Sequence, residues 1–392
     1  MKKLHIMHVI LDLYLAGAQE VVRTLVNYSQ RHDCVVTVCS FRDGPMRSKI
    51  EALGTTVHIL NRPEHDVTQL PLFLADLKQI RNQLVELVET HQVDVIQTHL
   101  LEVLDFVCLK VRDVSSLKAV FWTIHNVEPL PTMPSHLLPA KRFVYRWLYH
   151  RLSKQVDGII AVSDEVAQAV ATIIKPPSNK ISTINNGVDV EQFQQSADKA
   201  TLCQTLGLAK DSALLLTVGR LTEQKGHCYL IDAARQIISH HAKAHFLFVG
   251  TGELQESLQS QATETGHGDH FHFLGNRTDI PQLLAVSDLF ILPSLWEGLS
   301  IALLEAMAAA KPIIATAVSG TTQVIRPNQT GFLVPAKNSH ALAEAINTAL
   351  TNSVQAQMFG LVARQYVVDH YSANKQALEH ITLYKQASNY EN

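Results

Sequence analysis

Short apolar runs alternate with helical patterns along the whole chain, and this alternation limits the fold more than any other feature. Strands that are apolar throughout and separated by helices are typical of parallel sheets covered on both faces. The runs are LHIMHVIL, VVTVCS, TVHIL, VDVIQTH, KAVFWTIH and DGIIAVS in the first half, and ALLLTVG, HFLFVG, FHFLG, DLFILPS and PIIAT in the second. Helical patterns stand between them, as over 71–90 and 340–351. The pattern predicts an α/β protein with two sets of parallel strands.

The length of the chain indicates how these strands are divided. A chain of 392 residues is too long for one ordinary hydrophobic core. We therefore predict two doubly wound, Rossmann-like domains, over residues 1–187 and 188–371. The boundary falls near NNGVDVEQFQQSADKA, where a predicted strand over 181–184 ends. Ligands of doubly wound sheets bind beyond the carboxyl ends of the strands, so two sheets that face each other would share one cleft.

Charge and cysteine content exclude several classes of protein. The formal net charge of −3 gives no bulk attraction to nucleic acid, so no nucleic-acid partner is expected. The five cysteines are scattered and include no CxxC pair. This argues against a disulfide framework and a zinc site, and it favours a reducing, cytoplasmic compartment.

The amino terminus has a basic start followed by an apolar stretch, which suits either a signal peptide or a buried strand. His5, His8 and Asp12 interrupt the apolar stretch, and this favours the strand. The longest other apolar run, 301–318, contains two charged residues and a proline. It therefore does not fit a membrane span.

Two glutamates, Glu297 and Glu305, stand in the otherwise apolar stretch PSLWEGLSIALLEAMAAAKP. A buried glutamate needs a partner for its carboxylate. Ser300 is predicted to cap a helix over 301–310, which places Glu297 before the positive end of that helix, where anions and hydroxyl-rich ligands bind. Glu305 lies more than one turn inside the helix. Sugar hydroxyls would supply its hydrogen bonds, and the alternative is a lysine or a backbone amide.

Two cations follow the strand in LLLTVGRLTEQKGHCYLIDA. Arg220 comes directly after the strand, and Lys225 precedes Gly226 and a helix. Cations beside a helix N-terminus suit a diphosphate, although cations in loops are often simply solvated. The order of glycine and lysine does not match a P-loop.

Two strand exits in the first half also carry candidate residues. In VILDLYLAGAQEVV, Gly17 lies between a strand and a helix, where a glycine lets backbone amides approach a phosphate closely. An ordinary turn explains it equally well, because no GxGxxG fingerprint is present. In FWTIHNVEP, His125 follows a strand and has either a functional or a structural role.

Together and in this order, these stretches resemble the family-four retaining glycosyltransferases, which have the GT-B fold. The resemblance rests on Gly17, TIHN, INNGVD, VGRLTEQKG and the Glu-x7-Glu pattern of EGLSIALLE. It covers nearly the whole second half, including LGNRTDIPQLLAVSDLFILPS, and in the first half the early loop, His125 and GIIAVS. We also expect a C-terminal helix over about 372–392 that packs back on the first domain.

The resemblance implies a role for each candidate in binding a nucleotide-sugar donor. Arg220 and Lys225 would neutralise the charge that develops on the leaving diphosphate. Glu297 would contact the transferred sugar, Glu305 the ribose, and His125 the sugar close to its reacting carbon. The implied catalytic residues are thus His125, Glu297, Arg220 and Lys225. The further implied donor contacts are Gly17 beside the diphosphate, Asn276 and Arg277 near the base, and the backbone amides of Gly298, Leu299, Ser300 and Ile301.

The chain departs from the family pattern at two points. Leu299 and Ser300 stand where Phe and Gly are frequent, and Ala16 precedes Gly17 where a Gly-Gly pair is frequent. These changes touch the sugar pocket and the approach to the phosphate. The family works without a metal ion or another cofactor, and the absence of a DxD motif agrees with this. No side chain is an obvious nucleophile, so we expect front-face displacement, in which the leaving phosphate helps to deprotonate the acceptor hydroxyl.

The implied activity is retaining transfer of a hexosyl or N-acetylhexosaminyl group. The donor would be a nucleoside-diphosphate sugar, with UDP as the expected nucleotide, and the acceptor a carbohydrate or glycolipid of a cell-surface polysaccharide or glycolipid pathway. Two alternatives stay open. A nucleotide-sugar epimerase of similar fold would turn over without an acceptor. A silent nucleotide-sugar-binding protein would have lost some of the charged motif residues, all of which are present here.

A basic, aromatic helix is predicted over 140–154. One side of this helix carries four apolar residues and one arginine: Phe143, Val144, Trp147, Leu148 and Arg151. Such a helix suits either peripheral contact with the inner face of a membrane or packing of its apolar side on the first sheet. The three histidines of GHGDHFHF fit a loop that leads into a strand better than they fit a metal site.

Overall fold

The computed structural model describes residues 2–60, 69–99, 104–127 and 138–388. The chain forms two compact units, and each has its own sheet. The first unit contains residues 1–186 and 373–392, and the second contains residues 187–372. The predicted boundaries, after residues 187 and 371, each differ from this division by one residue.

The first unit is built on a seven-stranded sheet in the order β3-β2-β1-β4-β5-β6-β7, and all neighbouring strands are parallel. Its strands are β1 (His5–Ile10), β2 (Val35–Ser40), β3 (Thr56–Ile59), β4 (Val95–His99), β5 (Ala119–Ile124), β6 (Gly158–Ala161) and β7 (Ile181–Thr183). The strand order reverses between β1 and β4. In doubly wound sheets such a switch point is where ligands bind.

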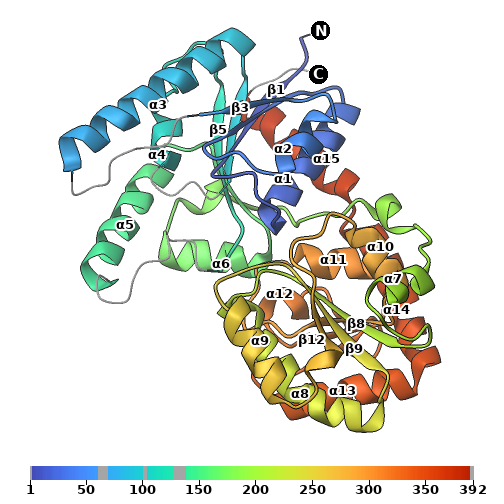
Figure 1. The fold of residues 1–392 in the computed structure, drawn as a ribbon. Helices are drawn as coiled ribbons and strands as arrows, with labels where there is room; N and C mark the ends of the chain where they lie inside the picture. The colour runs from blue at the N-terminus through green and yellow to red at the C-terminus, as the bar shows by residue number, and fades with distance from the viewer. Residues whose placement is uncertain (1, 61–68, 100–103, 128–137, 389–392) are drawn as a thin grey trace. The chain divides into compact units, whose positions relative to one another are not determined.

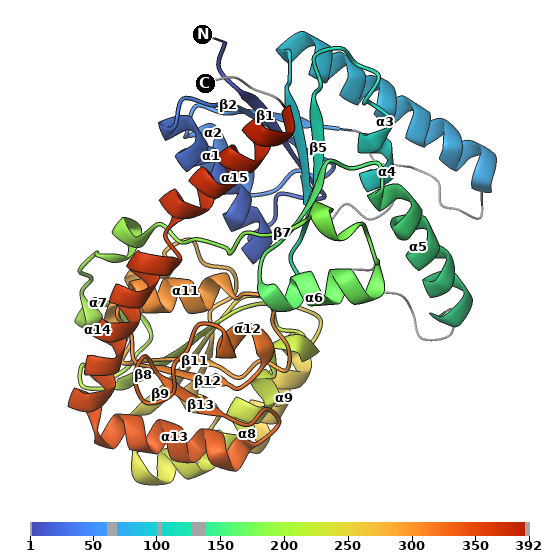
Figure 2. The same ribbon diagram turned by 180° about the vertical axis from the view of Figure 1, so that it is seen from behind.

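Helices cover both faces of this sheet. They are α1 (Gly17–Arg31), α2 (Met46–Glu51), α3 (Leu70–His91), α4 (Leu104–Leu109), α5 (Leu138–Ser153), α6 (Asp164–Ile173) and α15 (Ala373–Ser388), with the 3₁₀ helix η3 (Ser178–Lys180). Figures 1 and 2 show α1, α2 and α15 together on one face and α3, α4 and α5 on the other. The C-terminal helix α15 is fixed by Tyr384, whose ring packs on Phe121 and whose hydroxyl donates to Gln97.

The second unit repeats the same winding with six parallel strands in the order β10-β9-β8-β11-β12-β13. Its strands are β8 (Ala213–Val218), β9 (Ala244–Val249), β10 (Phe271–Phe273), β11 (Leu289–Leu292), β12 (Ile313–Thr316) and β13 (Phe332–Val334). By position, β8 corresponds to β1 and β11 to β4. The switch point of this sheet therefore lies between β8 and β11.

The helices of the second unit begin with α7 and end with α14. They are α7 (Lys199–Thr205), α8 (His227–His240), α9 (Gln255–Glu264), α10 (Ile280–Val286), α11 (Ile301–Ala308), α12 (Ser319–Thr322), α13 (Ser339–Thr351) and α14 (Ser353–His370). Short 3₁₀ helices are η4 (Val190–Phe193), η5 (Glu223–Lys225) and η6 (Gly268–His270). None of the helices in the described part of the chain has the length and apolar character needed to cross a membrane.

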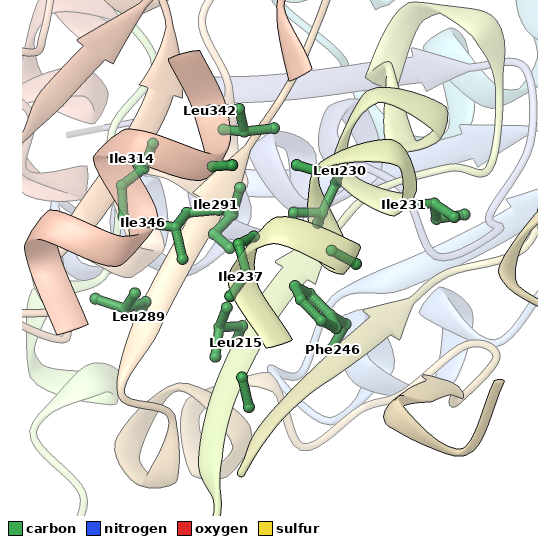
Figure 3. Close-up of a cluster of buried hydrophobic side chains, with 14 of the residues drawn as sticks. Leu215, Leu230, Ile231, Ile237, Phe246, Leu289, Ile291, Ile314, Leu342 and Ile346 are labelled. Atoms are coloured by element: carbon green, nitrogen blue, oxygen red, sulfur yellow. The ribbon is translucent and has the colours of Figure 1, made fainter. Parts of the chain in front are cut away.

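Alternating side chains of the second sheet fill a core on each face. Leu215, Ile291 and Ile314 point toward α8 and α13, where they meet residues such as Leu230 and Ile346 (Figure 3). Their chain neighbours along the strands are also buried, on the opposite face of the sheet. Each fully buried side chain of this size contributes about 1.5–3 kcal/mol. Strands buried on both faces explain why the sequence shows apolar runs rather than strict alternation.

The sequence predictions of secondary structure hold for long apolar runs and fail at weak or interrupted ones. The expected strand over the N-terminal apolar run is β1. The strand β13 was not predicted, because it has three residues, lies at the sheet edge and is only partly buried. Helix α11 ends at Ala308, two residues before the predicted end. Ala310 has a left-handed backbone with φ of 55°, which stops the helix ahead of Pro312.

Candidate functional site

In the second unit, the loops that follow β8 and β11 lie against each other, because these two strands are neighbours. The backbone N–H of Leu295 donates to the Gln224 carbonyl at 2.7 Å, and Gln224 Nε2 donates to the Trp296 carbonyl at 3.0 Å. Gly226 has φ of 60°, and a Cβ there would lie 2.2 Å from the Pro293 carbonyl oxygen. Only glycine allows both this backbone and this close approach.

This contact between loops brings together two of the predicted residues. Lys225 Nζ donates to Glu297 Oε1 at 2.6 Å, and Ser294 Oγ donates to the same oxygen at 2.6 Å. The side chains of Lys225 and Glu297 are 14% and 5% exposed. At such burial each charge depends on the other, because an unpaired ion would lose its hydration without compensation. Ser294 was missed in the sequence, where only its place at a strand exit could have suggested a role.

The other predicted residues of this edge lie close to Lys225 or Glu297 in the sequence. Arg220 is the second residue after β8 and is exposed. Ser300 caps α11 as predicted, with its Oγ accepting from the Leu303 N–H at 3.4 Å. Glu305 is partly buried in the second turn of α11. The first residues of α8 and α11 follow the two loops, so two positive helix ends stand at the carboxyl edge of the sheet.

A short helix that the sequence did not predict, α12, holds the backbone around Glu297. Ser319 Oγ donates to the Glu297 carbonyl at 3.2 Å. A Cβ on Gly320 would lie 2.5 Å from the Gly298 carbonyl oxygen, so α12 approaches this loop as closely as the backbone permits. The residues whose amides were predicted to contact the donor are all buried: Gly298, Leu299, Ser300 and Ile301. The loop is thus a packed part of the unit.

Asn276 and Arg277 follow β10, two strands away from β8, and the structure does not join them to the Lys225–Glu297 pair. Arg277 instead forms a bidentate ion pair with Asp279, with N–O distances of 2.8 and 2.6 Å. This pairing raises the pKa of Arg277 and lowers the pKa of Asp279. Asn276 is exposed.

The remaining two predicted residues, Gly17 and His125, belong to the first unit. Gly17 is the first residue of α1, directly after the β1 loop, and is exposed. His125 follows β5, and its Nε2 lies 3.2 Å from Nδ1 of His99. Sequence analysis missed His99 and its neighbour His8, although both stand inside or at the end of predicted strands.

The histidines of GHGDHFHF lie in the second unit, where they were expected to form a loop that leads into a strand. His270 lies in η6 and His272 in β10, which is the loop-to-strand arrangement predicted for GHGDHFHF. Among the residues that the structure describes, no three His, Cys, Asp or Glu side chains are grouped so that they could hold a metal ion.

The fold and these strand ends can be compared with known protein families. A model described as Glycosyltransferase Family 4 matches residues 15–192, and one described as Glycosyl transferases group 1 matches residues 198–366. Together they match most of the chain. The chain belongs to the family-four glycosyltransferases.

The sequence matches to curated relatives cover only part of this chain. A UDP-Gal:alpha-D-GlcNAc-diphosphoundecaprenol alpha-1,3-galactosyltransferase of Escherichia coli is 34% identical over 52% of this chain and 54% of its own length. An alpha-maltose-1-phosphate synthase of Mycolicibacterium smegmatis is 26% identical over 68% of this chain and 72% of its own. The match thus spans little more than half of the first relative.

Solved structures show that this family-four glycosyltransferase has the GT-B fold. Anabaena HepE in complex with UDP-glucose has a TM-score of 0.80 at 23% identity, over 96% of this chain and 99% of that one. A glycosyltransferase from Rickettsia africae has a TM-score of 0.80 at 20% identity and covers both chains completely. The predicted fold of two Rossmann-like domains is therefore confirmed.

Proposed function

We propose that this protein is a retaining glycosyltransferase that moves a hexosyl or N-acetylhexosaminyl group from a UDP-sugar to a carbohydrate or lipid-linked acceptor. The observation that carries the proposal is the buried Lys225–Glu297 pair at the switch point of the second sheet. In a member of this family, a cation held at two helix N-termini is suited to a diphosphate.

The chemistry of donor binding follows from these charges. A diphosphate at the ends of α8 and α11 meets Lys225 and the exposed Arg220, which offset the negative charge of the leaving group. Glu297 holds Lys225 through Oε1. Its second oxygen is left for a hydroxyl of the transferred sugar. Glu305, one turn into α11, takes the ribose hydroxyls.

The proposed reaction needs no metal ion, because Lys225 and Arg220 supply the positive charge. The acceptor hydroxyl attacks the anomeric carbon from the side of the departing diphosphate, and the C–O bond to the phosphate breaks. The hydroxyl proton passes to the leaving phosphate oxygen, so the charges balance. Attack on this face retains the anomeric configuration.

Support for the choice of UDP and of a lipid-linked acceptor comes from relatives. The Escherichia coli relative is named for UDP-Gal and for alpha-D-GlcNAc-diphosphoundecaprenol. HepE was solved with UDP-glucose. We extend these preferences to this chain, with a cell-surface polysaccharide or glycolipid as the final product.

The donor assignment is tested by calorimetry of the purified protein with UDP-, GDP- and ADP-sugars, together with their slow hydrolysis. One UDP-sugar is expected to bind best, and Lys225→Ala is expected to abolish this binding. Lys243→Ala is the matched control, because Lys243 lies in the same unit in an exposed ion pair with Asp211. Tighter binding of a GDP- or ADP-sugar would overturn the choice of UDP. If no nucleotide-sugar binds, the transferase proposal fails.

A second assay separates transfer from epimerisation. The preferred donor is incubated with and without a lipid-diphosphate sugar acceptor, and the products are resolved by NMR. Transfer predicts a new α-linked product only in the presence of acceptor. Conversion of the donor to its epimer without acceptor would favour the epimerase instead.

We further propose that α5 touches an anionic lipid surface. Phe143 and Trp147 are 71% and 53% exposed on one side of the helix. Arg151 stands one turn further, with its guanidinium 5.9 Å from the Trp147 ring centre, and Arg146 and Lys154 are also exposed. The side chains of residues 138–142, which include two predicted cations, lie outside the described residues. Exposed aromatic residues beside cations suit anionic headgroups.

The contact would be made from the cytoplasmic side, in keeping with five free cysteines. Flotation with vesicles of phosphatidylglycerol, and of phosphatidylcholine, tests it. The unmodified protein is expected to float with the anionic vesicles. The double variant Phe143→Ser/Trp147→Ser is expected not to float with them. Leu361→Ser, on the exposed side of α14, controls for general loss of apolar surface. Equal flotation of both variants would overturn the proposal.

A further inference from the structure

Three histidine rings form a row across the carboxyl edge of the first sheet. His8 lies in β1, His99 ends the neighbouring strand β4, and His125 follows β5. His8 Nδ1 is 3.1 Å from His99 Nε2, and His99 Nδ1 is 3.2 Å from His125 Nε2. Both distances fit a hydrogen bond between ring nitrogens, in which one nitrogen donates and the other accepts. The row therefore links β1, β4 and the β5 exit through their side chains.

All three rings are neutral at neutral pH. Burial lowers the pKa of His8 to about 3 and that of His125 to about 4, and it lowers the pKa of His99 well below its ordinary value. His380 of α15 interacts electrostatically with all three rings, and burial lowers its own pKa to about 4. Apart from these four histidines, no titratable group of the described residues contributes to the lowered pKa values. A neutral imidazole carries one N–H, so the direction of each hydrogen bond fixes the next.

The buried end of the row selects one direction. His8 Nε2 has no hydrogen-bond partner among the described residues. A buried N–H without an acceptor is rarer in proteins than an acceptor without a donor. The proton of His8 is therefore assigned to Nδ1, which donates to His99 Nε2. His99 then carries its proton on Nδ1 and donates to His125 Nε2, which leaves the His125 proton on Nδ1.

We propose that His8 and His99 are positioning residues that hold His125 as its Nδ1–H tautomer, so that the site receives a hydrogen-bond donor at that nitrogen. His125 is the one ring of the row that is only partly buried, so its outer nitrogen is the one a ligand can reach. The acceptor it suits is a hydroxyl or phosphate oxygen. That this oxygen belongs to a sugar nucleotide rests on the proposed function, whereas the tautomer does not.

The tautomer is read directly by NMR of the protein labelled with ¹⁵N in its histidine rings. The two ring nitrogens differ strongly in chemical shift according to which carries the proton. At about pH 7 we expect the His125 signal, assigned by its loss in His125→Gln, to report protonated Nδ1 and bare Nε2. Protonated Nε2 would overturn the proposal. This measurement uses the unmodified protein and needs no substrate.

Two substitutions of His99 form a matched pair. In His99→Asn the side-chain amide can occupy the place of Nδ1 and still donate to His125. In His99→Gln the amide reaches the place of Nε2 instead and loses the contact with His125. We expect His125 to stay Nδ1–H in the Asn variant and to show Nε2–H, alone or in a mixture, in the Gln variant. An unchanged tautomer in both would overturn the role of His99. Circular dichroism verifies folding, and the unmodified protein decides the tautomer if a variant does not fold.

Kinetics separate positioning from a merely structural role. If transfer is observed, kcat of His99→Gln should be about tenfold below that of His99→Asn, the cost of one hydrogen bond to the ligand. The dependence of kcat on pH should show no ionisation of His125 between about pH 5 and 8, because the ring stays neutral. Equal kcat in the two variants would overturn the positioning role. Absence of transfer in the unmodified protein would instead overturn the proposed function, while the NMR result stands.

Discussion

In the first unit, His8 inside β1 and His99 at the end of β4 are neutral imidazoles that bond to each other, whereas the loops after the corresponding strands β8 and β11 of the second unit form an ion pair. The winding of the two sheets is the same up to the sixth strand. Their chemistry differs, because burial lowers the pKa of His8 and of His99, whereas Lys225 and Glu297 form a buried salt bridge. The same strand order thus carries two different sets of side chains, and the function must be argued from the site rather than from the fold.

The largest effect should follow from breaking the ion pair of the second unit. Lys225→Met leaves Glu297 as a buried charge without its cation. The free energy of unfolding should fall by about 3–5 kcal/mol, and transfer should fall by about 100-fold or more. Urea unfolding and the transfer assay measure the two effects.

The double variant Lys225→Met/Glu297→Gln separates stability from activity. It removes both charges, so stability should largely return while activity should not. If the single and double variants are equally unstable, the pairing of charge does not explain this site, and the contrast between the units fails.

Glycine substitutions give the next largest effect, and each unit supplies one. Gly226→Ala in the second unit combines a left-handed backbone with a contact of 2.2 Å to the Pro293 oxygen, and we expect a loss of about 3 kcal/mol. Gly54→Ala in the first unit has φ of 79° but no atom within 4 Å, so it should lose only about 1 kcal/mol. Thermal unfolding compares them. Equal losses would mean that the loop contact after β8 and β11 is not rigid.

The neutral histidines predict how stability depends on pH. The pKa of His8 is near 3 when folded and 6.5 by its ordinary value, so the unfolded chain binds the extra proton between these values. His8 therefore contributes its full stability above about pH 6.5 and loses it as the pH falls. In His8→Asn the slope of unfolding free energy against pH, between about pH 4 and 6, should drop by about 1.4 kcal/mol per unit.

The control for this slope is His340→Asn, since the His340 side chain is 71% exposed. It should leave the slope unchanged. Urea midpoints at several pH values give both slopes. A slope that His8→Asn does not alter would show that His8 is protonated in the folded protein, contrary to the contrast drawn between the units.

The smallest effect is expected for an arginine that is already paired. Arg277 is held by Asp279 and is partly exposed, so Arg277→Ala should change nucleotide affinity less than about threefold. Arg220 is exposed beside the Lys225 loop, and Arg220→Ala should weaken binding about tenfold. Calorimetry with the nucleoside diphosphate ranks the two. A larger loss for Arg277→Ala would shift the anion site toward β10.

Much of both sheets could be predicted from local sequence. The strand β2 was predicted with its observed bounds, and the exits of β8 and β11 were recognised because each long apolar run leads into a loop that carries a charged residue. The cap at Ser300 was also visible, since a serine before an apolar helix has few other uses. Weak segments such as β13 and α12 were missed, because a few residues carry too little periodicity to be recognised.

The sequence by itself determined that there are two parallel sheets and which side chains stand at the ends of their strands. Only the tertiary structure decided which of these side chains meet. Lys225 and Glu297 are 72 residues apart, and they touch because β8 and β11 are neighbours in the sheet. His8 and His99 are 91 residues apart and meet across β1 and β4 for the same reason. Strand order sets these contacts, and it depends on the packing of the whole sheet rather than on any local pattern of residues.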